Sequence, residues 1–373
     1  MSGAVPYLDL GAAYRELADE LDAAVLRVVR SGRYILGPEV EAFETDFSAH
    51  TGTAHAVGCA TGLDALILAL RALGIEPGDE VIVASNTYIA TWLAVSAVGA
   101  RIVPVEPDPQ TALIEPDAVA AAIGPRTAAV LCVHLYGRAC DGRALRALCD
   151  ARSIALIEDA AQAHGAQRDG VRAGAFGHVG CFSFYPSKNL GALGDAGAVT
   201  TDDAALADRV RVLRNYGARE RYNNEVVGMN SRLDPVQAAV LSVKLAHLDA
   251  WNARRQAIAA TYDAALAGLP ELAVAAARDG DVQHLYVVRS ADRDGLREHL
   301  AAAGVGSEIH YPIPPHLSDA YAHLGHRAGA FPVAERLAAE VLSLPIGPQL
   351  ERVQVEAVID AVRAWRPAVA LAA

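Results

Sequence analysis

A single lysine, Lys188, is the residue of this sequence whose type and setting most clearly point to chemistry. The chain of 373 residues contains 32 lysines and arginines, but only Lys188 and Lys244 are lysines. Lys188 stands in the stretch FSFYPSKNLGALGDAG, between aromatic and serine residues and a series of glycines. A lysine amine can lose its proton and become nucleophilic, whereas an arginine in a protein cannot. We therefore expect Lys188 to act through its neutral amine.

An acidic residue, Asp159, is the second candidate, because it ends the apolar run in SIALIEDA. Ligands of open α/β sheets bind at the carboxyl ends of strands. A carboxylate placed there is poorly solvated and needs a cationic partner. Gln162 follows three residues later and would face the same place if a helical turn follows. When Asp159 is considered alone, a purely structural ion pair explains its position as well as a binding site does.

The turn GCATGLDAL lies where an apolar strand should pass into a helix. Unpaired N–H groups at a helix N-terminus attract anions, and Thr61 would add a hydroxyl for a phosphate. An ordinary helix cap explains the same residues when they are considered alone. Ser183 lies near the end of another apolar run, VGCFSFY, and should leave its strand toward the same edge.

Together these residues are the fixed points of a site for pyridoxal 5'-phosphate. Lys188 would form the Schiff base with the cofactor aldehyde, and Asp159 would keep the pyridine nitrogen protonated. The Thr61 turn would hold the phosphate. Tyr88, in SNTYIAT, is the aromatic residue available to stack on the ring. The combination is more specific than its parts, so we expect Lys188 to be the catalytic residue.

Other motifs give weaker indications. LGALGDAG precedes a strand and has the wrong glycine spacing for a dinucleotide-binding turn. His323 and His326 have helical spacing but no acidic partner, so we expect no metal site. Lys244 lies in a predicted helix, where we expect it to be solvated or to extend along the surface. His310, in EIHYPIPP, is explained either by a role in the site or by simple burial in a loop.

The candidates need strands and helices that bring them to one edge of a sheet. From residue 55 the chain alternates short apolar runs with helix-length segments, which predicts a largely parallel sheet covered on both faces. Seven runs are expected to be strands: HAVGCA, DEVIVAS, RIVPVE, TAAVLCVHLYG, SIALIEDA, VGCFSFY and GAVTTDD. The predicted fold class is therefore α/β.

A second, smaller domain is expected after a change of pattern near Leu233. Residues 234–268 predict a long helix with Pro235 in its first turn and Gly268 near its end. Beyond it, the runs HLYVVRS and GVGSEIHY predict strands, and residues 292–304, 330–344 and 351–365 predict helices. We expect a large domain over residues 1–248, including the N-terminal segment, and a small α+β domain over residues 249–373.

Composition narrows the class of function. The formal net charge of -12 argues against nucleic acid as a partner. The sequence shows neither a signal-peptide pattern nor an apolar run long enough to span a membrane, so a cytoplasmic location is expected. The five cysteines, an odd number without any C-x-x-C spacing, are interpreted as reduced thiols in or near the core.

The sequence resembles the DegT/StrS family of nucleotide-sugar aminotransferases, which have the aspartate-aminotransferase fold (fold type I). The likeness covers nearly the whole chain, in motifs such as SGRYILGPEVEAFE, TGLDAL, IEDAAQAHGA, FSFYPSKNLGALGDAGAV, GMNSRLDPVQAA and IHYPIPPH. It implies the seven-stranded sheet of that fold. It also implies that Lys188 and Asp159 have the roles given above, and that Leu63 replaces a hydroxyl-bearing residue of the phosphate turn.

The resemblance implies further site residues. Gln162 would bond the phenolic oxygen of the cofactor ring, while Thr61, Gly62 and Ser183 would hold the phosphate. Asn230, in GMNSR, is similar to the residue that reaches the phosphate from the other subunit, which implies a homodimer with shared active sites. The positions that anchor the sugar in relatives correspond to Tyr185, His310 and Tyr311.

The function implied is transfer of an amino group from L-glutamate to a dTDP-linked 3-keto-6-deoxyhexose, because the runs NLGALGDAGAV and NEVVGMNSRLDPVQAA look most like that subgroup. Amination at C-4 or of a keto-cyclitol is the first alternative. A pyridoxal-phosphate-dependent sugar dehydratase is another, although dehydratase relatives carry histidine in place of the lysine. A non-catalytic partner or regulatory protein of the same fold is the last.

Overall fold

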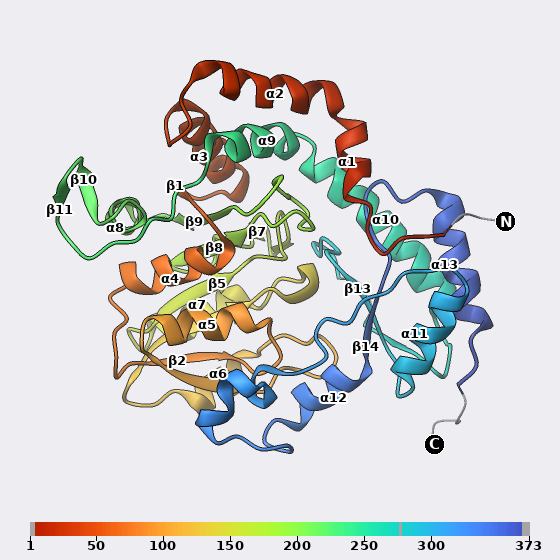
Figure 1. Cartoon of the computed structure of the whole chain (residues 1–373). Coiled ribbons are helices and arrows are strands. Elements are labelled where there is room, and N and C mark those ends of the chain that lie inside the picture. The colour runs from red at the N-terminus through yellow and green to blue at the C-terminus, as the bar shows by residue number, and fades with distance from the viewer. Residues whose placement is uncertain (1–3, 276–277, 368–373) are drawn as a thin grey trace.

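A seven-stranded sheet forms the centre of the molecule (Figure 1). The structure is a computed structural model that describes residues 4–275 and 278–367. The strand order is β1-β9-β8-β5-β4-β2-β3; β9 runs antiparallel to both neighbours and the other pairs are parallel. The strands are β1 (His55–Cys59), β2 (Glu80–Ala84), β3 (Arg101–Val105), β4 (Thr127–Val133), β5 (Ala155–Asp159), β8 (Val179–Ser183) and β9 (Gly197–Thr201). All seven predicted runs therefore form strands of one mostly parallel sheet, as expected.

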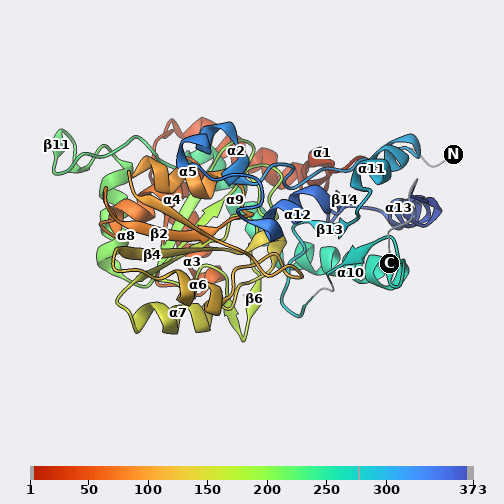
Figure 2. The same ribbon diagram turned by 90° about the horizontal axis from the view of Figure 1, so that it is seen from below.

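Helices cover both faces of this sheet, because its strands are apolar on both sides. Figures 1 and 2 show α4 (Gly62–Ala72) and α5 (Ile89–Ala97) on one face, and α6 (Pro116–Ala122) and α7 (Gly142–Asp150) on the other. The helix α8 (Ala204–Arg214) follows β9 and packs on α4. Short elements complete this part: η1 (Leu135–Gly137), the pair β6 (Gln167–Arg168) and β7 (Val171–Arg172), and the protruding pair β10 (Ala218–Glu220) and β11 (Asn223–Asn224).

The N-terminal segment forms three helices, α1 (Leu10–Glu16), α2 (Ala18–Ser31) and α3 (Pro38–Thr51). Both α2 and α3 pack against α9 (Pro235–Leu245). The single long helix expected over residues 234–268 is in fact two helices, since α9 ends at Leu245 and α10 (Leu248–Leu266) begins after a break. Pro235 does occupy the first turn of α9, as predicted.

The C-terminal part contains a three-stranded antiparallel sheet of β12 (Ala273–Val274), β13 (Tyr286–Arg289) and β14 (Val341–Leu344), with α11 (Arg293–Ala302) and α13 (Arg352–Ala364). The helix predicted over residues 330–344 was too long. The observed helix is α12 (Pro332–Glu340), and the four residues after it form β14, which pairs with β13. The strand predicted in GVGSEIHY is also wrong, because only isolated bridges form there, at Val305 and Glu308. The remaining turns are η2 (Pro315–Leu317) and η3 (Asp319–Leu324).

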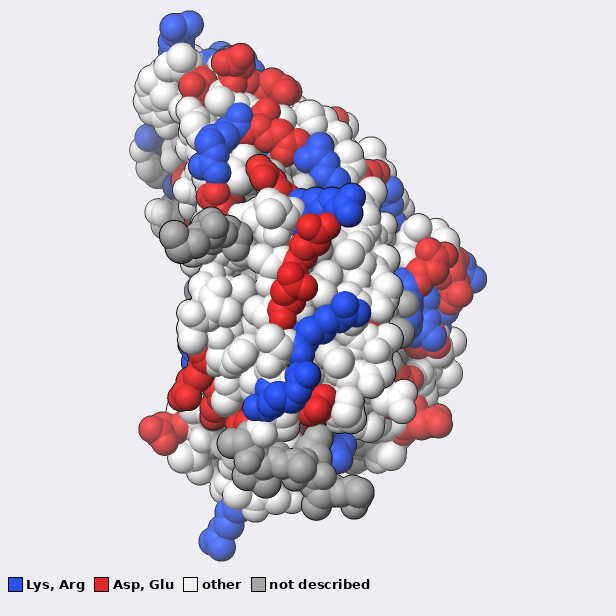
Figure 3. Space-filling view, turned by 90° about the vertical axis from the view of Figure 1, so that its right-hand side faces the viewer, with Lys and Arg blue, Asp and Glu red and all other residues white. Residues whose placement is uncertain are grey.

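A separate hydrophobic cluster lies around the three-stranded sheet and includes Tyr262, Val288, Leu342 and Val358. Val5, near the N-terminus, belongs to the same cluster and pairs with Val305. The domain boundary expected near residue 248 stays a prediction. Figure 3 shows the face of the molecule on the C-terminal side, where acidic and basic side chains are interspersed among uncharged ones.

Two chain-wide expectations concern the cysteines and membranes. All five cysteines are buried and none forms a disulfide, as predicted. Over residues 4–275 and 278–367, none of the helices has the length and apolar character needed to cross a bilayer.

Candidate functional site

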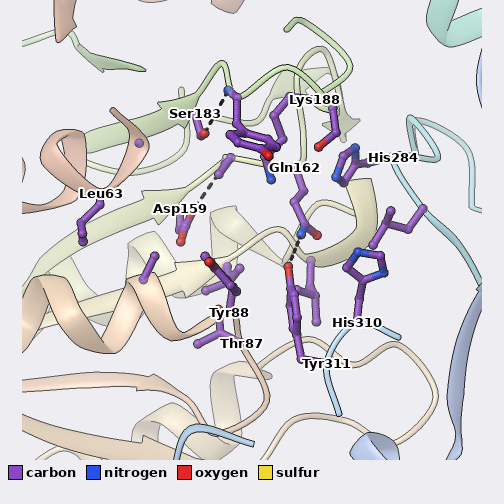
Figure 4. Close-up of a pocket in the computed structure, with 18 of the residues that line it drawn as sticks. Leu63, Thr87, Tyr88, Asp159, Gln162, Ser183, Lys188, His284, His310 and Tyr311 are labelled. Carbon is purple, nitrogen blue, oxygen red and sulfur yellow. Dashed lines mark hydrogen bonds between the residues drawn. The ribbon is translucent and has the colours of Figure 1, made fainter. Parts of the chain in front are cut away.

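A cavity of about 540 Å³ opens beside the carboxyl ends of β5 and β8 and the N-termini of α4 and α5. Figure 4 shows its side chains converging from these elements and from the loop that contains His310 and Tyr311. It brings together every predicted site residue except Asn230, namely Thr61, Gly62, Tyr88, Asp159, Gln162, Ser183, Tyr185, Lys188, His310 and Tyr311. The carboxyl edge of the sheet is therefore where the candidates meet, as the sequence predicted.

Lys188 lies in the loop that follows β8, where its backbone N–H donates to the carbonyl oxygen of Tyr185 over 2.8 Å. Burial lowers the pKa of its amine to about 8, and the Asp159 carboxylate opposes that shift. No hydrogen-bond partner for the amine occurs among the residues that the structure describes. An amine with this pKa is roughly one-tenth neutral at pH 7, far more than an ordinary lysine, which favours a role for Lys188 as a nucleophile or a base.

Asp159 is the last residue of β5 and is 7% exposed. Its carboxylate accepts from Thr91 Oγ1 at 2.9 Å and from the Ala161 N–H at 3.2 Å. Burial nevertheless raises the pKa of this carboxyl, which the two hydrogen bonds and Lys188 partly counteract. A carboxylate that faces a cavity and is short of solvent would gain stability from a cationic ligand.

The N-terminus of α4 meets the sheet at unusually close range. A Cβ on Gly62 would lie 2.4 Å from the Cβ of Ser183, and one on Gly197 would lie 2.3 Å from the carbonyl oxygen of Thr61. Thr61 Oγ1 caps the helix by accepting from the Asp64 N–H at 3.0 Å. The ordinary capping role is therefore present, and the start of α4 also lines the cavity. Leu63 lines the same cavity without offering a hydroxyl.

Both polar atoms of the Gln162 side-chain amide form hydrogen bonds. Its Oε1 accepts from the backbone N–H of Tyr136 at 2.6 Å, and its Nε2 donates to the hydroxyl of Tyr311 at 3.0 Å, as Figure 4 shows. One amide N–H remains for a ligand. Tyr88 lies beside Tyr311, with ring centroids 5.1 Å apart, and is 53% exposed. These contacts orient Gln162 toward the cavity and leave Tyr88 able to cover a bound ring.

His310 and Tyr185 both line the cavity. His310 Nδ1 is 2.9 Å from Ser343 Oγ on β14, and burial together with the charge of Lys188 lowers the pKa of the imidazole to about 4. A neutral imidazole there can donate or accept a hydrogen bond but carries no charge. Tyr185 is 54% exposed, which places an accessible phenol at the opening.

His284 and Arg255 are among the cavity residues that the sequence interpretation missed. His284 Nδ1 is 3.0 Å from Oδ1 of Asn189, the residue after Lys188, and burial keeps the pKa of this imidazole well below its ordinary value. Both residues reach the site through tertiary packing of the C-terminal part. One arginine among thirty and one histidine in an apolar run gave no local signal.

Asn230 and Arg232 do not line the cavity of this chain. Asn230 is exposed and forms an isolated bridge with Asn215. The Arg232 guanidinium donates to Asn215 Oδ1 at 3.1 Å and lies over the ring of Tyr216, 5.4 Å from its centroid. The role predicted for Asn230, in the site of a second subunit, therefore stays a prediction.

The expectation for Lys244 was wrong. This lysine is 7% exposed, and its amine donates to the carbonyl oxygen of Gly191 at 2.6 Å. Burial lowers the pKa of this amine to about 8 as well. The two lysines therefore share a lowered pKa and differ in position, because only Lys188 lines the cavity.

Among the residues described, no cluster of three or more histidine, cysteine or acidic side chains has the arrangement of a metal site.

Comparison with known proteins shows that this chain is similar to sugar aminotransferases. A transaminase of Streptomyces venezuelae, dTDP-3-amino-3,4,6-trideoxy-alpha-D-glucose transaminase, is 58% identical over 97% of this chain and 96% of its own length. A crystal structure of S. venezuelae DesV in complex with a ketimine intermediate is 57% identical, with a TM-score of 0.96, and the match covers 98% of this chain and 99% of that one. The structure of NtdA from Bacillus subtilis with bound cofactor PMP is 29% identical, with a TM-score of 0.92 over 97% of this chain and 85% of that one.

The family model that describes the DegT/DnrJ/EryC1/StrS aminotransferases matches residues 15–363. This range includes the whole central sheet and all the cavity residues that the sequence predicted. The chain has the fold of these enzymes and a lysine, an acid and a helix N-terminus at one cavity, and it belongs to the DegT/DnrJ/EryC1/StrS aminotransferase family.

Proposed function

We propose that this protein is a pyridoxal-phosphate-dependent aminotransferase that moves an amino group from L-glutamate to C-3 of a dTDP-linked 3-keto-6-deoxyhexose. The observation that carries the proposal is one cavity shared by the Lys188 amine, the Asp159 carboxylate and the N-terminus of α4. The 58% identity to a dTDP-3-amino-sugar transaminase supports the choice of substrate class. The enzyme would serve deoxysugar biosynthesis, and we expect it in the cytoplasm.

The cavity offers partners for the phosphate, the pyridine nitrogen and the phenolic oxygen of the cofactor. Thr61, Gly62 and Ser183 would hold the phosphate at the start of α4, where Gly62 packs directly on Ser183. Asp159 would face the pyridine nitrogen, whose positive charge relieves the cost of burying the carboxylate. Gln162 would use its remaining N–H for the phenolic oxygen. When bound, pyridoxal phosphate supplies an aldehyde for amines and a ring that accepts electrons.

Lys188 has two tasks in the proposed reaction. Its neutral amine would join the cofactor aldehyde with loss of water and so hold the cofactor covalently in the resting enzyme. After an amino substrate takes its place, the freed Nζ would serve as the base that removes a proton from the carbon that carries the amino group. Burial favours both tasks, since it lowers the pKa of the amine to about 8. An amine of ordinary pKa would be almost entirely protonated at neutral pH and would do both more slowly.

The sugar would bind at the outer side of the cavity, where Tyr185, His310 and Tyr311 offer hydrogen-bonding groups. We further propose a homodimer in which Asn230 of each chain reaches the phosphate in its partner's site, because Asn230 is exposed and lies outside its own cavity. Lysine rather than histidine at position 188 favours transamination over dehydration.

The decisive experiment supplies the enzyme, loaded with pyridoxamine phosphate, with a panel of 3-keto and 4-keto dTDP-sugars and keto-cyclitols. Return of the absorbance of the lysine-bound cofactor identifies the acceptor, and mass spectrometry of the product shows whether nitrogen has replaced the keto oxygen. Amination of a 3-keto dTDP-sugar supports the proposal. Reaction only with 4-keto sugars or cyclitols contradicts the assigned position, and loss of oxygen without gain of nitrogen indicates a dehydratase.

A further inference from the structure

Arg255, on α10, is a buried arginine at one end of the cavity, where it lies with Tyr7, Leu8 and Ile346. It is 4% exposed. Its Nη1 is 3.3 to 3.4 Å from the main-chain carbonyl oxygens of Gln283, His284 and Ile346. Its Nε is buried and has no hydrogen-bond partner in the described part of the chain. The guanidinium is thus only partly satisfied by the protein.

This guanidinium also lacks a counterion. Across residues 4–275 and 278–367, no carboxylate oxygen lies within 4.0 Å of it. Burial lowers its pKa to about 10, but it keeps its charge near neutral pH. Arg214, which is similarly buried, shows the usual arrangement, since its Nη1 lies 2.5 Å from Glu44 Oε1. A buried cation without such a partner is costly, so its place on a cavity wall indicates an anionic ligand.

We propose that Arg255 binds a carboxylate of the amino donor; this rests on the proposed function and adds a residue for its first substrate. Every amino acid donor carries a carboxylate into the cavity along with the amino group that must reach Lys188. A guanidinium has the opposite charge to a carboxylate, and its two parallel N–H groups fit the two carboxylate oxygens. Because Arg255 is 4% exposed, a compact carboxylate fits better than the phosphates of a nucleotide sugar. Arg232 lies outside the cavity and already donates to Asn215.

The test follows the donor half-reaction by loss of the absorbance of the lysine-bound cofactor in the full-length enzyme, and the acceptor half-reaction by the return of that absorbance. Arg255→Gln should raise the KM for L-glutamate by about 10- to 100-fold, as expected for loss of a hydrogen-bonded charge. The KM for the keto sugar should change less than about 3-fold, as is usual when a residue does not contact that ligand. Arg254→Gln is the matched control, because Arg254 is the neighbouring residue and its exposed guanidinium pairs with Glu16 at 2.8 Å.

Two other donors identify which carboxylate is bound. L-Glutamine keeps the α-carboxylate and lacks the γ-charge, whereas 4-aminobutanoate lacks the α-carboxylate. The wild-type enzyme should prefer L-glutamate to the donor that lacks the carboxylate bound by Arg255. This preference should disappear in Arg255→Gln. If the preferences remain and both half-reactions weaken together, Arg255 is only structural and the proposal is wrong.

The Arg255→Lys variant keeps the charge and guards against a failure of Arg255→Gln to fold. It should show a smaller rise in the KM for L-glutamate, again without an effect on the keto sugar. The donor reaction needs no sugar, so the result does not depend on the identity of the acceptor. A wild-type enzyme that fails to react with L-glutamate or any other amino acid contradicts the proposed function itself, whereas an unchanged donor KM in Arg255→Gln contradicts only this assignment.

Discussion

The amine of Lys244 donates a hydrogen bond to the carbonyl oxygen of Gly191, 2.6 Å away. Lys244 belongs to α9, and Gly191 lies three residues after Lys188. Gln237, on the same helix, accepts from the backbone N–H of Leu193 at 2.8 Å. The helix α9 therefore holds the loop that contains Lys188 at two points.

Replacing Lys244 by methionine should loosen this loop. Methionine has a similar length but no donor, so a buried carbonyl loses its partner at a cost of about 1–3 kcal/mol. We expect a lower midpoint of urea unfolding and a lower kcat with saturating cofactor. The Lys244→Gln variant keeps an N–H donor and should lose less of both. A Lys244→Met protein as stable and as active as the wild type would show that the contact does not hold the loop.

The Lys188→Arg variant should lose both the absorbance of the lysine-bound cofactor and turnover. Arginine keeps the positive charge and most of the volume, but it does not release its proton and therefore cannot form the covalent link. The fold should remain, as circular dichroism would show. Lys244→Arg is the control, and it should keep the absorbance because Lys244 lies outside the cavity. A Lys188→Arg protein that stayed yellow and active would overturn the assignment of the catalytic residue.

The capture of pyridoxal phosphate by cofactor-free protein should depend on pH through Lys188. Its amine must be neutral to react, so the rate should rise as pH increases through the pKa of about 8. Asp159 raises this pKa by stabilising the charged form. Asp159→Asn should therefore move the midpoint to lower pH, while Asp195→Asn, at another cavity residue, should leave it in place. Stopped-flow absorbance measures the rate, and an upward or absent shift in Asp159→Asn contradicts this electrostatic account.

Local sequence patterns were sufficient for the central sheet and for the residues at its edge. Runs of β-branched residues mark the strands, and parallel connections bring their carboxyl ends together, so Asp159, Ser183 and Lys188 meet without further information. The segment TGLDAL likewise indicated a helix N-terminus at this edge, and α4 begins there, although its close packing on Ser183 at Gly62 was not predicted.

Features set by tertiary contacts were not predictable in the same way. The helical pattern of residues 330–344 continues past Glu340, but pairing with β13 turns Val341–Leu344 into a strand. The periodicity around Lys244 gave no sign that this face of α9 would be covered by the loop after Lys188. Arg255 reaches the cavity only because α10 packs beside it, and nothing in its sequence neighbours distinguishes it from other arginines.

A homodimer with shared sites predicts complementation between two inactive variants. Lys188→Ala lacks the amine, and Asn230→Ala lacks the side chain proposed to reach the partner's cofactor phosphate. In a mixed dimer one site receives an intact copy of each residue, so activity should return when the two proteins are refolded together. Sedimentation velocity would confirm the dimer. No recovery from mixed dimers, despite verified exchange of subunits, would place Lys188 and Asn230 in the same site or remove Asn230 from it.

Gly62→Ala should weaken the binding of the cofactor phosphate. The added methyl carbon would lie 2.4 Å from the Cβ of Ser183, so α4 must shift away from β8, and such overpacking costs about 1–3 kcal/mol. Because the shift moves the N–H groups at the start of α4, equilibrium dialysis should show weaker binding of pyridoxal phosphate but nearly unchanged binding of pyridoxal, which has no phosphate. Gly124→Ala is the control, since its methyl carbon would meet its nearest neighbour, Glu80 Oε2, at an ordinary 3.5 Å. Equal losses for both ligands would mean that the N-terminus of α4 does not hold the phosphate.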